Sequence, residues 1–136
     1  MRKVFAFAVV ASLLLVALSM ASACSPPQRA RAVKLDVGDA GHRVELKTGQ
    51  TLDISLEANP TTGYTWEAEG LDEHILQPVG EPEFKPQSNL IGAPGILALH
   101  FQAVGTGQTT LKLVYHRPWE KEVKPLETYS VEVVVR

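Results

Sequence analysis

Apolar side chains at every second position are the feature that most limits how this chain can fold. In residues 51–57, Leu52, Ile54 and Leu56 alternate with polar residues. An alternation with a period of two indicates a β-strand that buries one face and exposes the other. The same pattern recurs in residues 33–37, 43–47, 97–103, 111–116 and 129–135.

Turn residues separate these segments and complete the prediction of the fold. Glycine-containing turns are expected at residues 38–41, 48–50 and 105–108, and further strands at residues 64–66 and 75–79. We find no convincing helix outside the N-terminal segment. Seven or more short strands in about 110 residues are typical of an all-β, immunoglobulin-like antiparallel β-sandwich. We expect a single domain whose two inner faces are formed by the alternating apolar residues.

The first 23 residues have the features of a secretory signal peptide. Arg2 and Lys3 precede a nearly continuous apolar run over residues 4–18, and small residues follow at positions 21–23. A positive start, an apolar run and a small-residue cleavage site define such a signal. The run is short for a membrane span, which needs about 20 apolar residues. We therefore expect residues 1–23 to be removed and the mature protein to be exported.

Cys24, the single cysteine, follows these small residues directly. The sequence Ala21-Ser22-Ala23-Cys24 resembles a bacterial lipobox, which implies cleavage before Cys24 and acylation of its thiol, although Ala21 replaces the usual leucine. The alternative is an ordinary cleavage that leaves a single free thiol, which is unusual in an exported protein. With the lipid, residues 24–32 would form a polar tether between the domain and a membrane. The domain would then lie in the cell envelope or periplasm.

The domain that follows is expected to span residues 33–136. With one cysteine in the chain it cannot contain an internal disulfide bond. It must therefore be stabilised by its hydrophobic core alone, which is feasible for a domain of this size.

Motifs for catalysis or metal binding are not evident in the sequence. The four histidines, His42, His74, His100 and His116, lack the short spacings of metal ligands. His100 and His116 fall on the polar face of expected strands, so they are either solvated or neighbours across a sheet. We expect no enzyme activity, no metal and no cofactor. A hydrolase whose carboxylates pair only in space is the weaker alternative.

The charge of the chain gives a prediction about its partners. The formal net charge is −2, and no block of like charge stands out. Proteins that bind nucleic acid usually present a basic stripe. The sequence therefore argues against a nucleic-acid partner.

The loop at residues 59–64 carries more constraint than a simple turn needs. Pro60 fixes its own φ, and the β-branched Thr61 and Thr62 have few rotamers. Gly63 can take the positive φ that a sharp exit requires. A loop that is already ordered loses little entropy when it binds a partner.

Two further loops carry unusual residues. The glycines of residues 92–95 allow a close approach of the backbone to another surface. Gly92 lies near the end of a long surface loop expected over residues 81–94, and Gly95 comes just after it. Residues 117–120 begin another loop and include Trp119. This tryptophan either binds a partner or folds back to cap the end of the sandwich, and both alternatives stay open.

These three motifs, in this order, resemble the chagasin-like family of cysteine peptidase inhibitors. The motifs are Asn-Pro-Thr-Thr-Gly-Tyr, Gly-x-x-Gly and Arg-Pro-Trp, and the resemblance covers essentially the whole domain. It implies an immunoglobulin-like fold, in agreement with the strand pattern. It also implies reversible, tight-binding inhibition of papain-like cysteine peptidases, with the three loops occluding the active-site cleft. The peptidase-binding residues that it assigns are Asn59, Pro60, Thr61, Thr62, Gly63, Tyr64, Gly92, Gly95, Arg117, Pro118 and Trp119.

The same resemblance implies a role for each loop. Thr61 and Thr62 would lie over the catalytic cysteine and histidine of the peptidase, and residues 92–95 would run along one side of the cleft. Arg117 and Trp119 would grip the other side. Pro94 departs from the family pattern, and the role of Glu120, next to the third motif, is open.

The sequence offers no reactive group for a covalent bond, so the expected mechanism is steric occlusion by a monomer. The alternative from another functional class is a lipid-anchored envelope binding module with an immunoglobulin-like fold, since such sandwiches host many functions. Three unusual loops favour the inhibitor, because an assembly module has no need for all of them.

Overall fold

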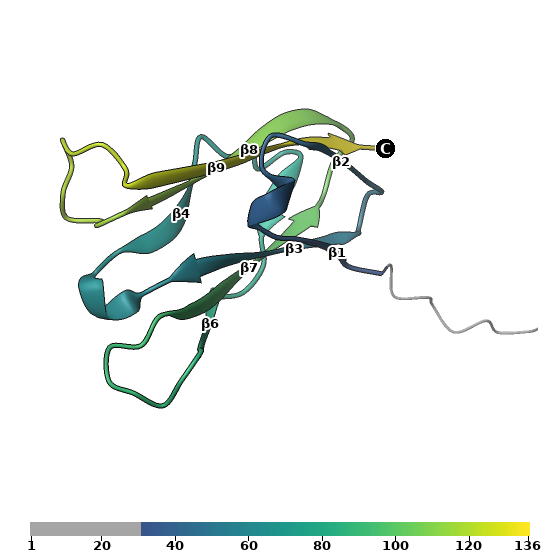
Figure 1. Cartoon of the computed structure of the whole chain (residues 1–136). Helices are drawn as coiled ribbons and strands as arrows, with labels where there is room; N and C mark the ends of the chain where they lie inside the picture. The colour runs from purple at the N-terminus through teal and green to yellow at the C-terminus, as the bar shows by residue number, and fades with distance from the viewer. Residues whose placement is uncertain (1–30) are drawn as a thin grey trace, which may run out of the picture.

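Nine β-strands and two short 3-10 helices make up residues 31–136, the part of the chain that the computed structural model describes (Figure 1). In chain order they are β1 (Val33–Leu35), η1 (Val37–Asp39), β2 (Arg43–Leu46), β3 (Thr51–Ala58), η2 (Pro60–Thr62), β4 (Thr65–Glu69), β5 (Leu76–Pro78), β6 (Glu83–Pro86), β7 (Gly95–Ala103), β8 (Gly107–His116) and β9 (Glu127–Val135). The expected signal peptide and Cys24 lie outside the described residues. Within residues 31–136, no helix is long and apolar enough to cross a membrane.

The strands form two sheets that pack face to face. The first sheet has the order β1-β3-β7-β5, with β6 also paired to β7, and the second has the order β2-β9-β8-β4. The alternating apolar residues meet between the sheets, where Leu52, Ile54, Leu111 and Leu113 are 0% exposed. Each such side chain contributes about 1.5–3 kcal/mol by burial. The prediction of an all-β, two-sheet sandwich in a single domain is confirmed.

Not every strand pair of the sandwich is antiparallel. β1 runs parallel to β3, with Val33 opposite Leu52, and β2 runs parallel to β9, with Arg43 opposite Glu132. Both parallel pairs lie at edges of the sheets, and the chain crosses from the first sheet to the second between β1 and β2. An alternating pattern indicates which face a strand buries and carries no information about strand direction.

The crossing between β1 and β2 uses η1, which begins one residue before the turn expected at residues 38–41. Asp36 caps this helix: its carboxylate accepts from the backbone N–H of Gly38 at 2.8 Å. In return, the carboxylate of Asp39 accepts from the backbone N–H of Asp36 at 2.8 Å. Such a reciprocal cap stabilises even a single helical turn.

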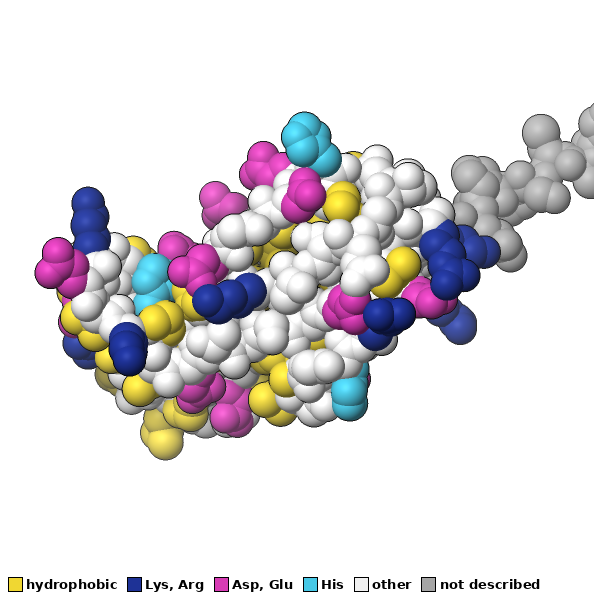
Figure 2. All heavy atoms as spheres, turned by 90° about the horizontal axis from the view of Figure 1, so that it is seen from above, with side chains coloured by type: hydrophobic (Ala, Val, Ile, Leu, Met, Phe, Trp, Pro, Cys, Tyr) yellow, Lys and Arg dark blue, Asp and Glu magenta, His cyan; other side chains and the backbone are white. Residues whose placement is uncertain are grey.

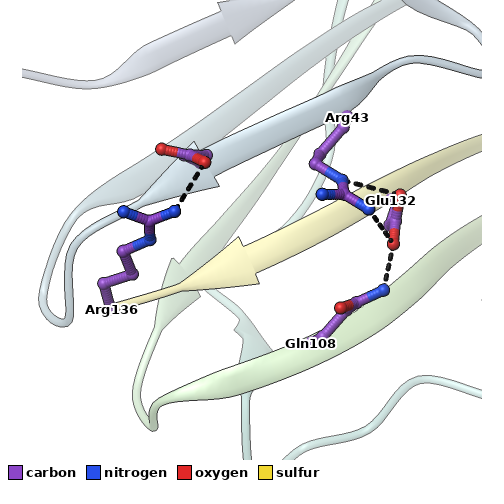
Figure 3. Close-up of polar contacts among 5 residues, drawn as sticks. Arg43, Gln108, Glu132 and Arg136 are labelled. Atoms are coloured by element: carbon purple, nitrogen blue, oxygen red, sulfur yellow. Dashed lines mark hydrogen bonds and ion pairs between the residues drawn. The ribbon is translucent and has the colours of Figure 1, made fainter.

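Side-chain pairs on the second sheet fasten the edge strand β2 to β9. Glu132 of β9 accepts hydrogen bonds from Arg43 Nε at 2.9 Å and Arg43 Nη2 at 3.1 Å, and Gln108 of β8 donates to the same carboxylate (Figure 3). The bond to Glu132 raises the pKa of Arg43. Arg136 pairs with Glu45 at 3.0 Å. Figure 2 shows side chains of both charge signs interspersed over the face seen from above.

The segment over residues 81–94 was expected to be a long surface loop, and this expectation is wrong for part of it. Residues 83–86 form β6, which pairs with the start of β7. Pro86 ends the strand, and Pro82 directly precedes it. Proline is tolerated in an edge strand, where its missing N–H is not needed for pairing. The strand shortens the loop and aims the rest of it toward the end where β7 begins.

Candidate functional site

The three loops singled out in the sequence lie at one end of the sandwich, on the left in Figure 1. The first loop, residues 59–64, joins β3 to β4 and contains η2. The second loop, residues 87–94, joins β6 to β7, and the third loop, residues 117–126, joins β8 to β9. Strand topology brings them together, because β3, β6 and β8 all end here.

The first loop is closed by its own hydrogen bonds. The Oδ1 atom of Asn59 accepts from the backbone N–H of Thr61 at 3.2 Å and from its hydroxyl at 2.5 Å. The hydroxyl of Thr62 donates to the backbone oxygen of Asn59 at 2.6 Å. Gly63 ends the turn with a φ of 81°, and its N–H donates to the backbone oxygen of Pro60 at 3.0 Å. Asparagine, proline and glycine thus occupy the cap, first helical and exit positions that favour them.

Trp119 of the third loop packs on Gly63. A Cβ atom added at Gly63 would collide with Cη2 of Trp119 and lie 3.0 Å from its Cζ2. Trp119 is nevertheless 66% exposed. The ring therefore neither caps the hydrophobic core nor projects freely, but leans against the first loop and leaves most of its surface open.

Arg117 ties the third loop to the first. Its Nε donates to the backbone oxygen of Thr62 at 3.1 Å, and its guanidinium carbon lies 4.5 Å from the centre of the Tyr64 ring. Its Nη1 pairs with Glu120 at 3.2 Å, and the backbone N–H of Glu120 donates to the backbone oxygen of Arg117 at 3.0 Å. The guanidinium group of Arg117 thus points toward the first loop, where it contacts Thr62 and Tyr64. Glu120, whose role was open in the sequence, orients the guanidinium.

Asn59 ties the first loop to the second. Its Nδ2 donates to the backbone oxygen of Gly92 at 3.1 Å, while its backbone N–H donates to the hydroxyl of Tyr115 at 3.0 Å. The Tyr115 ring stacks on Trp66 with centroids 5.0 Å apart and lies 5.3 Å from Tyr64. Tyr115 was recognised in the sequence only as an inward-facing residue of its strand. Its place two residues before the third loop could have indicated a role in anchoring the site.

Two apolar residues beside Gly92 were also missed by the sequence reasoning. Leu90 is 78% exposed and Ile91 is 105% exposed, so neither side chain is covered by the domain. Figure 2 shows hydrophobic side chains at the surface on this end of the molecule. The sequence did contain a signal for them, because two adjacent aliphatic residues are unexpected in a segment rich in proline and glycine. Large exposed apolar side chains that gather on one surface commonly mark an interaction site.

The described residues that were assigned to the site lie at one end of the sandwich. Gly95 lies there too, opposite Ala58, but it is buried at the start of β7, and a Cβ there would collide with the backbone oxygen of Lys85 in β6. Close strand pairing therefore explains this glycine. Cys24, assigned to lipidation, lies outside the described residues.

The histidines do not gather into a reactive group. His100 of β7 bonds Asp53 at 2.8 Å in the first sheet, and His116 of β8 bonds Glu67 at 2.8 Å in the second. The alternative that His100 and His116 are neighbours across a sheet is therefore wrong. Within residues 31–136, no group of three or more His, Cys, Asp or Glu residues is arranged to hold a metal ion.

Comparisons with known proteins agree with this arrangement. The family model described as "Chagasin family peptidase inhibitor I42" matches residues 45–133. Amoebiasin-2 of Entamoeba histolytica is 37% identical over 95 residues, covering 68% of this chain and 76% of the relative. Chagasin of Trypanosoma cruzi is 30% identical over 95 residues, covering 67% of this chain and 86% of the relative.

A solved structure has the same fold. The crystal structure of the cysteine protease inhibitor EhICP2 from Entamoeba histolytica superposes with a TM-score of 0.68 at 29% identity, covering 77% of this chain and 96% of that chain. The family match covers most of the described domain, including both the first and the third loop. The chain belongs to the chagasin family, a family of peptidase inhibitors rather than enzymes.

Proposed function

We propose that this protein is a reversible, tight-binding inhibitor of papain-like cysteine peptidases and that its three loops occlude the active-site cleft. The observation that carries the proposal is the cross-bonding of the loops: Arg117 binds Thr62 of the first loop, and Asn59 binds Gly92 of the second. The loops therefore form one continuous edge whose shape exists before a peptidase arrives. Support for this class of target comes from the family description, which names peptidase inhibitors, and from EhICP2, which is described as a cysteine protease inhibitor.

The mechanism is steric and requires no covalent bond. Thr61 and Thr62 are exposed at the tip of the first loop, where they would lie over the catalytic residues of the peptidase. Both hydroxyls are bonded to Asn59 within the loop and offer no activated nucleophile. A preorganised loop loses little entropy on binding, and the exposed apolar surface of Trp119 and Ile91 is available for burial.

The direct test is a titration of papain with the purified protein, in which the remaining peptidase activity is measured as hydrolysis of a fluorogenic peptide. We expect stoichiometric and reversible loss of activity, and we expect Thr62→Arg to abolish it because a long charged side chain at the tip prevents entry into the cleft. Thr106→Arg is the matched control, because Thr106 is exposed in the turn at the opposite end of β7. A folded protein that leaves papain and a cathepsin-L-like peptidase active would contradict the proposal and favour an envelope binding module.

The link between the first and third loops gives a second expected result. Arg117→Lys keeps the positive charge but loses the planar fork that reaches both Thr62 and Glu120. Loss of a charge-assisted hydrogen bond costs about 1.5–3 kcal/mol, so we expect inhibition to weaken by about tenfold or more, mainly through faster dissociation. Stopped-flow or surface-binding kinetics measure this rate.

Arg43→Lys is the matched control for that experiment, because it disrupts a two-bond pair with Glu132 on the second sheet, outside the three loops. This variant should dissociate from papain at the rate of the unchanged protein. An unaltered dissociation rate in Arg117→Lys would show that the bond to Thr62 does not hold the binding edge together.

We also propose that the protein is exported and attached to a membrane of the cell envelope through a lipid on Cys24. The support is the sequence alone, namely the apolar run of residues 4–18 and the small residues before Cys24. In a bacterial expression host, the protein should label with radioactive palmitate and partition with membranes, and Cys24→Ser should do neither. Recovery of unlabelled protein in the soluble periplasmic fraction would refute the lipid anchor.

A further inference from the structure

The end of β8 holds the first loop at both of the loop's ends. At the entry, the backbone N–H of Asn59 donates to the hydroxyl of Tyr115 at 3.0 Å. At the exit, the backbone oxygen of Thr62 accepts from Nε of Arg117 at 3.1 Å. Tyr115 lies in β8, and Arg117 directly follows this strand. One short segment therefore fixes where the loop begins and where it ends.

The bond at the entry joins the two sheets of the sandwich. Asn59 directly follows β3 of the first sheet, whereas Tyr115 belongs to β8 of the second. Backbone pairing within a sheet does not set the position of a strand in the other sheet, so side chains must do this. The Tyr115 ring is well placed for it, because it is 8% exposed and stacks on Trp66, its partner in β4, with centroids 5.0 Å apart. A hydroxyl on such a packed ring is an acceptor at a fixed point.

Asn59 passes this position on to the tip of the loop. Its Oδ1 accepts from the backbone N–H of Thr61 at 3.2 Å, and its backbone oxygen accepts from the hydroxyl of Thr62 at 2.6 Å. Its Nδ2 donates to the backbone oxygen of Gly92 in the second loop at 3.1 Å. Its backbone N–H, by contrast, bonds to Tyr115, a residue of the hydrophobic core. The core thus positions the exposed threonines through Asn59.

We propose that Tyr115 is a positioning residue for peptidase inhibition, a role that rests on the proposed function: its hydroxyl keeps Asn59, and with it the tip of the first loop, in the shape that fits the cleft. Tyr115 is buried and would not touch the peptidase. Loss of the hydroxyl therefore leaves the contacts with the peptidase intact but lowers the fraction of free molecules whose loop has the binding shape. The association rate falls by that fraction, while the dissociation rate stays the same.

Tyr115→Phe tests this role, because it removes the hydroxyl and preserves the stacked ring. Loss of one hydrogen bond corresponds to about a fivefold change in an equilibrium. In stopped-flow experiments with papain we therefore expect association to be about fivefold slower and dissociation to be unaltered. Arg117→Lys differs from this variant, because its expected effect is faster dissociation.

Tyr129→Phe is the matched control. Tyr129 is also buried, at 2% exposed, and lies in the neighbouring strand β9. Among residues 31–136, its hydroxyl has no hydrogen-bond partner. Removing this hydroxyl breaks no bond to the first loop, so both rate constants should equal those of the unchanged protein.

Amide hydrogen exchange in the ¹⁵N-labelled protein tests the bond without a peptidase. In Tyr115→Phe we expect the backbone N–H of Asn59 to exchange at least about fivefold faster, because its acceptor is gone. The N–H of Leu99, in the middle of β7, should exchange at an unaltered rate. A purely structural role of Tyr115 would instead speed exchange at both amides. Tyr129→Phe should leave Asn59 unaffected.

Three results would overturn the proposal. Unaltered exchange at Asn59 in Tyr115→Phe would show that the hydroxyl does not hold the loop. Faster exchange with an unaltered association rate would show that the position of the loop does not limit binding. Equal slowing of association in Tyr129→Phe would assign the effect to the core as a whole. If the unchanged protein does not inhibit papain, the proposed function fails with the role in inhibition, whereas exchange at Asn59 still decides whether Tyr115 holds the first loop.

Discussion

Replacing Gly63 with valine is expected to raise the inhibition constant against papain by at least about 100-fold. The φ of 81° at this residue costs an ordinary L-residue about 1–2 kcal/mol, and a β-branched residue resists it more strongly. The new Cβ would also collide with the Trp119 ring, so either the first loop or Trp119 must move. Displacing a tryptophan anchor adds about 2 kcal/mol, and each 1.4 kcal/mol is tenfold in affinity.

Gly49→Val separates these two causes. Gly49 lies in the turn between β2 and β3, has a φ of 89°, and has no atom within 4 Å of an added Cβ. It therefore shares the backbone strain but not the contact with Trp119. We expect Gly49→Val to lower the melting temperature while the inhibition constant stays unchanged. Undiminished inhibition by a folded Gly63→Val protein would show that the binding edge does not depend on the shape of the first loop.

Trp119→Ala is expected to weaken inhibition by about 30-fold or more, which corresponds to the loss of at least about 2 kcal/mol at a tryptophan hot spot. The melting temperature should change little, because Trp119 is 66% exposed and contributes little to the core. Inhibition kinetics and thermal unfolding on the same sample measure the two effects separately.

Leu126→Ala is the matched control, because Leu126 is 61% exposed at the far end of the third loop. It removes apolar surface of the same loop and should leave inhibition nearly unchanged. If Trp119→Ala instead unfolds the domain, the ring caps the structure and its exposed surface is not the source of affinity. If the two variants inhibit equally well, Trp119 is not an anchor.

The strand pattern was predictable because it depends on local chemistry. Residues 51–57 alternate in sequence, and Leu52, Ile54 and Leu56 are buried as that alternation requires. The edge strand β6 was missed because its alternation is weak: all of its residues are exposed or nearly so, and Phe84 is 36% exposed. A strand that buries neither face leaves no periodic signal to read.

The sequence indicated which motifs fall in loops, but it did not reveal how these loops contact one another. The expectation that Arg117 grips a peptidase stays a prediction, and the structure adds that its guanidinium is bonded to Thr62 and Glu120. Gly95 was expected in a loop, whereas the approach of β6 accounts for it. In both cases the deciding contact comes from a distant segment, so inspection of the motif itself could not reveal it.

The sequence by itself determined the buried face of each major strand and the closed geometry of the first loop, because periodicity and the preferences of Asn59, Pro60 and Gly63 act over a few residues. The tertiary structure alone decided that three loops share one edge. The bond from Asn59 to Gly92 spans 33 positions, and the bond from Arg117 to Thr62 spans 55. Contacts at such separations depend on strand order and register across the sheets, which are fixed only when the two inner faces pack together.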